Sequence, residues 1–258
     1  MLVKKSLVLV ILIAALPKLH AQIFEIGAGV GGLNYKGDVL PKYKPFVVDP
    51  GANLFGRMNI SRSISLKANV VAGRVHANDS DMDDVYHRTR GFNFNARILE
   101  MGGQIEYNFL NFRTSSSRNA TNWSPYVFGG AAFTIRSTNY NIRSYSDILL
   151  PSFYYTSGYS DTRTNAWILG IGFKKELSPH WNWGMEFGTR WINDDFVDGL
   201  GYNKDGVYNT NLNTGIDNIV KYNLKTQVPG TRTKDMYYYT NFSISYVFYK
   251  IYCPPVRR

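Results

Sequence analysis

Few residues of this chain have side chains suited to chemistry. A single cysteine, Cys253, lies close to the C-terminus. His76 and His87 flank a polar segment that contains Ser80, and hydrolases use histidine with serine for nucleophilic catalysis. The same segment, Asp79–Asp84, reads Asp-Ser-Asp-Met-Asp-Asp and resembles the start of a calcium-binding loop. These groups define the candidate sites.

Neither the hydrolase pattern nor the calcium pattern is complete. A calcium loop needs Gly at its sixth position and Glu at its twelfth, where this chain has Asp84 and Arg90. The histidines do not stand beside a serine in any predicted strand. The glycines of Gly27–Gly32 resemble a dinucleotide fingerprint, but no helical pattern follows them. We therefore predict no enzyme, no metal and no cofactor, and keep a lipid-modifying barrel enzyme as a minor alternative.

The N-terminus has the pattern of a secretory signal peptide. Lys4 and Lys5 precede an apolar run, Ser6–Leu16, and Ala21 precedes the predicted cleavage site. The run is shorter than the roughly 17–25 residues that a transmembrane helix requires. Residues 1–21 are therefore predicted to be removed, which lowers the formal net charge from +10 to +7 because three lysines are lost. The remaining basic residues are scattered, so no nucleic-acid binding is predicted.

The elements that must position these groups are β-strands. The final strand shows this best, because its bulky residues alternate with small polar ones. Tyr238, Thr240, Phe242, Ile244, Tyr246 and Phe248 share one face, and Asn241, Ser243 and Ser245 share the other. A tilted strand of about 9–11 residues crosses a bilayer. Because an open sheet edge is not tolerated in lipid, this strand is expected to pair with the first.

Eight such strands are predicted, with alternating short and long connections. They lie near residues 23–32, 52–60, 64–72, 91–109, 124–136, 167–173 and 181–191, and the last begins at Met236. The long connections, including residues 137–163, are expected outside the cell and the short ones in the periplasm. In the fourth strand the apolar residues change face, which suggests a β-bulge near Leu99–Gly103.

These features predict an all-β fold, an eight-stranded antiparallel outer-membrane β-barrel over residues 22–250. A soluble β-sandwich or lipocalin-like barrel is the rival fold. In such a soluble fold the bulky residues face inward and the charged residues face outward. Here the charged residues lie opposite the bulky ones, and a soluble interior that held these charges would be strongly disfavoured unless they formed pairs.

Charged residues occupy the face that would line the lumen. They are Glu25, Arg57, Lys67, Arg97, Glu100, Glu106, Arg136, Lys174, Glu186 and Arg190. An eight-stranded barrel is barely wide enough for its own side chains. We therefore predict that Glu25, Arg57, Lys67, Glu186 and Arg190 form a structural charge network that fills the lumen, with an ion path as the alternative.

The tail, residues 251–258, is predicted to lie in the periplasm. It holds Cys253 and two basic residues, Arg257 and Arg258, which suit an acidic partner surface. An unpaired cysteine in an oxidising compartment either forms a disulfide with another chain or stays a packed free thiol. Both alternatives stay open, and Cys253, Arg257 and Arg258 are the predicted partner-binding residues.

Several stretches together resemble the PorG-like family of outer-membrane barrels, which belongs to the type IX (Por) secretion system. They are Gly31–Asp38, Ile105–Phe109, Ser124–Gly130, Trp191–Asp198 and the ending Cys253-Pro254. The resemblance implies an anchoring role in secretion, in which the barrel docks periplasmic ring subunits, both lipoprotein and soluble. A small pore or adhesive barrel is the alternative function.

Overall fold

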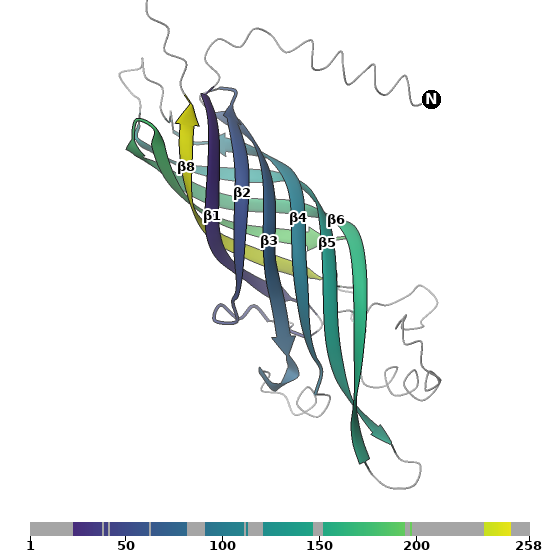
Figure 1. Ribbon diagram of the computed structural model, residues 1–258. Helices are drawn as coiled ribbons and strands as arrows, with labels where there is room; N and C mark the ends of the chain where they lie inside the picture. The colour runs from purple at the N-terminus through teal and green to yellow at the C-terminus, as the bar shows by residue number, and fades with distance from the viewer. Residues whose placement is uncertain are drawn as a thin grey trace, which may run out of the picture.

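The protein is a closed barrel of eight antiparallel strands (Figure 1). The computed structural model describes residues 23–37, 39–40, 42–61, 63–81, 91–110, 112, 121–146, 152–193, 197 and 235–248. The strands are β1 (Ile23–Lys36), β2 (Asp49–Asn59), β3 (Ile64–Asn78), β4 (Asn93–Asn108), β5 (Trp123–Ser146), β6 (Ser152–Ser178), β7 (Trp181–Ile192) and β8 (Met236–Phe248). The predicted fold class is confirmed.

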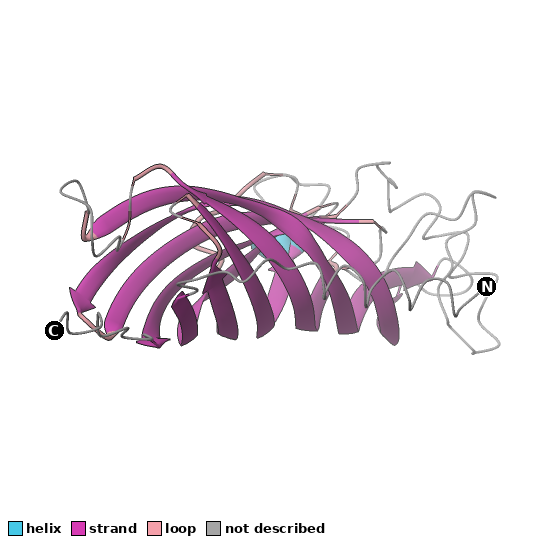
Figure 2. Cartoon of the chain, turned by 90° about the horizontal axis from the view of Figure 1, so that it is seen from above, coloured by secondary structure: helices cyan, strands magenta, loops and turns pink. Residues whose placement is uncertain are grey.

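Each strand pairs with the next along the chain, and β8 pairs with β1 from Phe24↔Phe248 to Lys36↔Met236. The predicted pairing of the last strand with the first is therefore correct. Within the barrel wall, closure gives every strand a neighbour on both sides. The strands are inclined and strongly curved, as seen from above in Figure 2.

Glycines let the β1–β8 seam and its neighbours pack closely. A Cβ atom on Gly31 would lie 2.0 Å from the carbonyl oxygen of Thr240, and one on Gly27 would lie 2.4 Å from the ring of Phe55. Glycine is the residue that permits such close approach. Gly27 therefore leaves room inside the barrel for the ring of Phe55, and Gly31 lets β8 approach β1 closely.

The outer face of the barrel is apolar. Many large side chains that point outward are about half exposed or more, including Ile26, Val30, Leu54, Ile105, Trp167, Leu169, Ile171, Phe242 and Ile244. Aromatic residues gather where β1 begins and β8 ends, including Phe24, Trp123, Trp181 and Phe248. Such an apolar band with an aromatic girdle faces lipid, and barrels of this kind reside in the bacterial outer membrane. The soluble rival is excluded, because its exterior would be polar.

Two sequence predictions about the strands are wrong. Residues 137–163 are not a simple loop, since β5 and β6 have 24 and 27 residues and pair as far as Ser146↔Ser152. Beyond the membrane neither face of a hairpin meets lipid, so the apolar alternation that marks a spanning strand is lost. The hairpin projects from the end of the barrel opposite the one where β1 begins at Ile23 and β8 ends at Phe248 (Figure 1).

The bulge predicted in the fourth strand is absent. The pairing of β4 with β3 and β5 runs without interruption through Leu99–Gly103. Phe94 and Ile98 point inward, as do Glu100 and Glu106 farther along. The apolar residues change face because the barrel interior changes from apolar to charged along its axis. The one register shift described lies between Glu176 and Ser178, beside the short turn to β7.

Helix contributes little to the described part of the chain. A short 3-10 helix, η1 (Asp79–Asp81), follows β3. No helix among the described residues is long and apolar enough to cross a membrane.

Candidate functional site

The lumen is the most highly organised part of the protein, and it has two layers. The outer layer is an apolar core of 17 buried residues, to which each strand except β2 contributes. Val39, Leu40 and Val197 belong to this core although they lie in the connections between strands. Asp235 fastens one of them, because its carboxylate accepts hydrogen bonds from the Tyr35 hydroxyl at 2.7 Å and the Val197 amide at 2.9 Å. The outer mouth is thereby closed by packed side chains.

The inner layer is a cluster of charges with Arg57 at its centre. Arg57 Nη1 lies 3.1 Å from Glu25 Oε2, Nε lies 2.9 Å from Glu106 Oε2, and Nη2 lies 3.7 Å from Glu186 Oε1. The Arg57 side chain is only 4% exposed. One guanidinium from β2 thus joins carboxylates from β1, β4 and β7, which matches its fork of five donors.

Two lysines complete this central cluster, which we define as Glu25, Arg57, Lys67, Glu106, Lys174 and Glu186. Lys67 donates to Glu186 Oε1, and Lys174 Nζ lies 3.6 Å from Glu106 Oε2. Three carboxylates therefore face three cations, so the cluster is balanced. Balance matters because an unpaired charge out of contact with water is strongly unfavourable.

Neutral side chains also donate hydrogen bonds to two of the three carboxylates of the central cluster. Tyr126 donates to Glu186 at 2.6 Å, while Asn59 and Ser245 donate to Glu25 at 2.9 and 3.1 Å. Farther along the lumen, Arg190 Nε lies 3.4 Å from Glu100 Oε2, and that oxygen also accepts from the hydroxyl of Tyr237. This second group joins β4, β7 and β8 across the barrel interior.

The five residues of the predicted charge network line the lumen. Glu25, Arg57, Lys67, Glu186 and Arg190 are all buried inside the barrel and form ion pairs there. Of the wider inward set, Arg97 is wrong, because it points outward at the end of the apolar band. It follows the outward parity of Leu99 and Met101, which the false bulge had reversed.

Sequence reasoning missed two hydroxyl donors, Tyr126 and Tyr237, which hold Glu186 and Glu100. The signal was present, since Tyr126 shares inward parity with Ser124 and Phe128. The rings of Tyr126 and Phe128 lie over glycines, because a Cβ on Gly172 or Gly170 would lie 2.3 or 2.4 Å from these two aromatic rings.

Those candidate hydrolytic and metal residues that the structure describes are not assembled into a site, and residues 82–90 lie outside the described part. His76 Nδ1 lies 2.6 Å from Asp49 Oδ2, a carboxylate that also accepts from the His76 amide. Ser80 is exposed, and His87 lies outside the described residues. His180 stacks on Tyr246 with ring centroids 5.6 Å apart. Within the described part of the chain, no group of three or more potential metal ligands occurs.

The predicted periplasmic partner residues Cys253, Arg257 and Arg258 lie outside the described residues, as does the predicted signal peptide. In the periplasmic turn between β2 and β3, the hydroxyl of Ser61 accepts hydrogen bonds from the amides of Ser63 and Ile64 at 3.3 and 3.0 Å. This turn is therefore tightly built.

Comparison with known proteins gives a family and related folds. A family model described as "Domain of unknown function (DUF6089)" matches residues 4–255. No curated protein matches the sequence. Similar solved structures are Ail of Yersinia pestis and a major outer membrane protein of Thermus thermophilus, each with a TM-score of 0.46. Their identities are 9% and 11%, and each match covers 89% of this chain and 100% of the other. Neisserial surface protein A has a TM-score of 0.43 and 10% identity, and its match covers 87% of this chain and 97% of the other.

Proposed function

The chain belongs to the DUF6089 family, and we propose that it is a non-enzymatic, non-conducting outer-membrane barrel that anchors a periplasmic protein assembly. We further propose that this assembly is the type IX secretion machinery. The observation that carries the first part is the filled lumen. Its outer layer is packed with apolar side chains, and its inner layer is a balanced cluster of six charges.

A lumen whose described side chains pair and pack in this way supports a role other than transport. Lumen charges that pair with one another brace the wall. Such a barrel acts through the surfaces at its two ends. The link to type IX secretion comes from the sequence resemblance to PorG-like barrels, which extends from Gly31–Asp38 to Cys253-Pro254.

The proposed docking surface is the periplasmic end. It comprises the turns at Ser61–Ser63 and Ser178–His180, the connection over residues 111–122 and the tail with Cys253, Arg257 and Arg258. The proposed partners are the lipoprotein and soluble subunits of the periplasmic ring. Cys253 would provide a covalent link if it forms a disulfide with one of them.

Crosslinking and pull-down from cell envelopes test the anchoring role. A tagged chain is expected to recover ring subunits, and a Cys253→Ser variant is expected to lose any adduct seen on non-reducing gels. Unaffected type IX secretion in a deletion strain would refute the secretion role. In planar bilayers the purified barrel is expected to give no stable conductance, and a large stable conductance would refute the filled lumen.

A second function, adhesion at the cell surface, is favoured by the projecting β5–β6 hairpin. Five residue pairs, from Ile142↔Thr156 to Ser146↔Ser152, lie beyond the last pair that joins β5 to β4. At about 3.3 Å a residue, they add roughly 16 Å of reach. Replacing residues 142–156 by a two-residue turn should abolish attachment of cells to surfaces if this function holds. Attachment equal to wild type would exclude it.

A further inference from the structure

Two features of the lipid-facing wall lie on the same strands. One is a hollow floored by small residues of β2 to β5, and the other is a pair of arginines farther along β3 and β4. Neither belongs to the lumen or to the periplasmic surface. Together they point to a ligand that is apolar at one end and anionic at the other.

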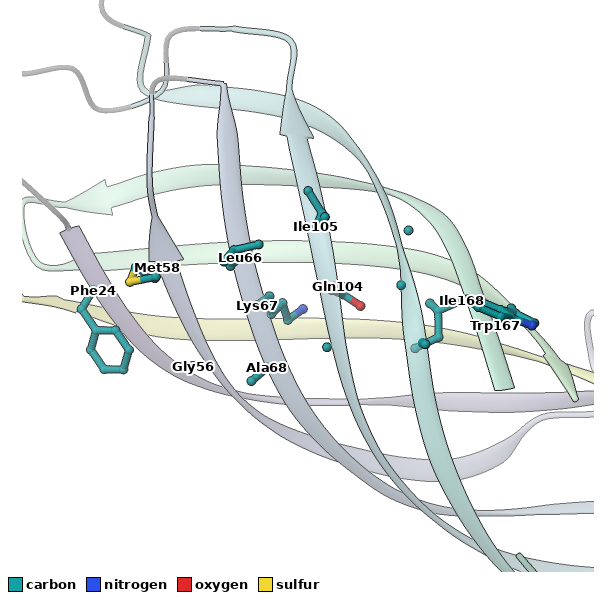
Figure 3. A pocket seen from close by; sticks show the side chains of 14 residues that line it. Phe24, Gly56, Met58, Leu66, Lys67, Ala68, Gln104, Ile105, Trp167 and Ile168 are labelled. Carbon is teal, nitrogen blue, oxygen red and sulfur yellow. The ribbon is translucent and has the colours of Figure 1, made fainter. Parts of the chain in front are cut away.

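The hollow arises because small residues line up across four strands. Gly56, Ala68, Gly103 and Ala131 are neighbours in register on β2, β3, β4 and β5. The larger side chains of Phe24, Met58, Leu66, Ile105 and Trp167 surround them and leave a hollow of about 870 Å³ (Figure 3). We call it the lipid-face hollow. Its floor is open, since a Cβ on Gly103 would meet no atom within 4 Å.

The hollow continues toward the outside of the cell. A second hollow of about 500 Å³ shares Gly103, Ala131 and Trp167 with the first. Its lining includes two polar side chains, Asn165 and Asn193, at the ends of the spanning parts of β6 and β7. The two hollows therefore form one groove that runs from an apolar part of the wall to polar side chains on β6 and after β7.

Two arginines lie farther along β3 and β4, and Arg97 is four residues beyond Met101, which lines the second hollow. Arg74 and Arg97 are directly paired across β3 and β4, and both side chains point outward and are exposed. Like charges placed directly opposite each other on a sheet are destabilising. Within the described residues no carboxylate lies at ion-pair distance from either of them. We call Arg74 and Arg97 the outer arginine pair.

Among the described residues, the nearest acid in the cross-strand row of Arg74 and Arg97 is Asp161 on β6. Its carboxylate accepts hydrogen bonds from the hydroxyls of Ser137 and Tyr159, each at 2.6 Å. These hydroxyls, and Arg163 beside it, lower the pKa of Asp161. Asp161 lies two strands from Arg97 and three from Arg74 in this row, so it forms no ion pair with either arginine.

The height difference between the two features matches one lipid leaflet. Arg74 is six residues from Ala68 on β3, and Arg97 is six residues from Gly103 on β4. Six residues span about 20 Å along a strand, which is roughly 15 Å of depth at the usual tilt. The hydrocarbon core of a bilayer is about 30 Å thick. The outer pair thus lies at head-group level when the hollow lies near the bilayer centre.

We propose that this wall binds a phosphate-bearing, acylated lipid of the outer leaflet. Its phosphate would accept hydrogen bonds from Arg74 and Arg97, and an acyl chain would lie along the groove into the lipid-face hollow. Arginine is well suited to a phosphate because its donors match two oxygens at once. The phosphate also relieves the repulsion between the two guanidinium groups.

A lipid fits better than a second copy of the chain. A two-fold dimer through this wall brings the same surface of both copies together. The outer arginine pair would then approach its own copy, which adds like charge instead of neutralising it.

The test uses the mature chain in nanodiscs of phosphatidylcholine that contain a minor fraction of either phosphatidic acid or diacylglycerol with the same acyl chains. Native mass spectrometry counts the lipids that stay bound when the barrel is released. Wild type is expected to retain phosphatidic acid but not diacylglycerol, and millimolar inorganic phosphate should not displace it. Removal of both cations in R74Q/R97Q should weaken retention about 30-fold, because each cation near a membrane surface contributes a factor of about five.

Two further variants separate the groove from the charge. Gly103→Leu fills the hollow and should reduce retention while both arginines remain, without disturbing the wall because its floor is open. Lys175→Gln removes an exposed cation near the opposite end of β6 and should change nothing.

Equal retention of lipid by all variants, or equal retention of phosphatidic acid and diacylglycerol, would overturn the proposal. A mass spectrum that shows the protein as a dimer, unchanged when lipid is added, would also overturn it. Heat-modifiable gel mobility verifies that each variant is folded. If R74Q/R97Q does not fold, Gly103→Leu decides alone. The proposal is independent of the role in secretion.

Discussion

Replacing Arg57 by methionine should destabilise the barrel strongly. Its guanidinium lies 2.9 Å from Glu106, 3.1 Å from Glu25 and 3.7 Å from Glu186. The central cluster has three acids and three cations, so Arg57→Met leaves one excess negative charge in a lumen that water barely reaches. Removing one partner of a buried ion pair costs about 3–5 kcal/mol. The total stability of a typical protein is only about 5–15 kcal/mol.

The expected loss lies toward the lower end of this range, about 3 kcal/mol. Each carboxylate keeps another partner after the substitution: Lys67 for Glu186, Lys174 for Glu106, and Asn59 with Ser245 for Glu25. In the double variant R57M/E25Q two acids face two cations again. Most of the lost stability should therefore return.

The assay is the free energy of unfolding in detergent micelles, from denaturant titration followed by tryptophan fluorescence. Lys175→Met, which removes an exposed cation, serves as the control and should change stability by less than about 0.5 kcal/mol. A loss below about 1 kcal/mol for Arg57→Met would refute the reasoning. A double variant no more stable than the single one would refute charge balance as its cause.

Three other perturbations test the wall, the outer hairpin and the closed mouth. Gly31→Ala should lower the stability of the barrel by about 1–3 kcal/mol or more, because the new Cβ would clash with the Thr240 carbonyl in the β1–β8 seam. Gly103→Ala should be tolerated, because its Cβ would meet no atom within 4 Å. Heat-modifiable gel mobility compares the two variants. Ser137→Ala should raise the pKa of Asp161 toward its ordinary 3.8, measured by NMR titration. Because the folded-state pKa is lowered, the contribution of this carboxylate is present above its unfolded pKa and is lost only as the pH falls through the folded value. Asp235→Ala removes the acceptor for Tyr35 and Val197 and should speed limited proteolysis near residue 197, and an unchanged rate would contradict its role as a fastener.

The faces of the spanning strands could be predicted from sequence because a strand has a period of two residues. In β8 the bulky residues Phe242 and Ile244 face lipid, while Ser243 and Ser245 face the lumen, as their alternation indicates. The same parity placed Glu25 and Arg57 inside. Bulky apolar side chains are favourable only on the face that contacts lipid, so each spanning strand has the alternating pattern in its own sequence.

The same local reasoning failed where the surroundings of a strand change along its length. Phe94 and Ile98 are apolar but point inward, because the outer part of the lumen is an apolar core. From sequence alone, this change of the apolar residues from one face of β4 to the other predicts a bulge. The continuous pairing of β4 with both neighbours shows that the interior changes instead.

The sequence by itself therefore determined the fold class, the closing pair of strands and, with the exception of Arg97, the charges that enter the lumen, because each depends on alternation within one strand. Tertiary structure alone decided which charges meet. Arg57 contacts carboxylates from three other strands, and Arg74 faces Arg97 only because β3 and β4 pair in that register. Register and barrel curvature are set by all eight strands together, so no single stretch of sequence contains them.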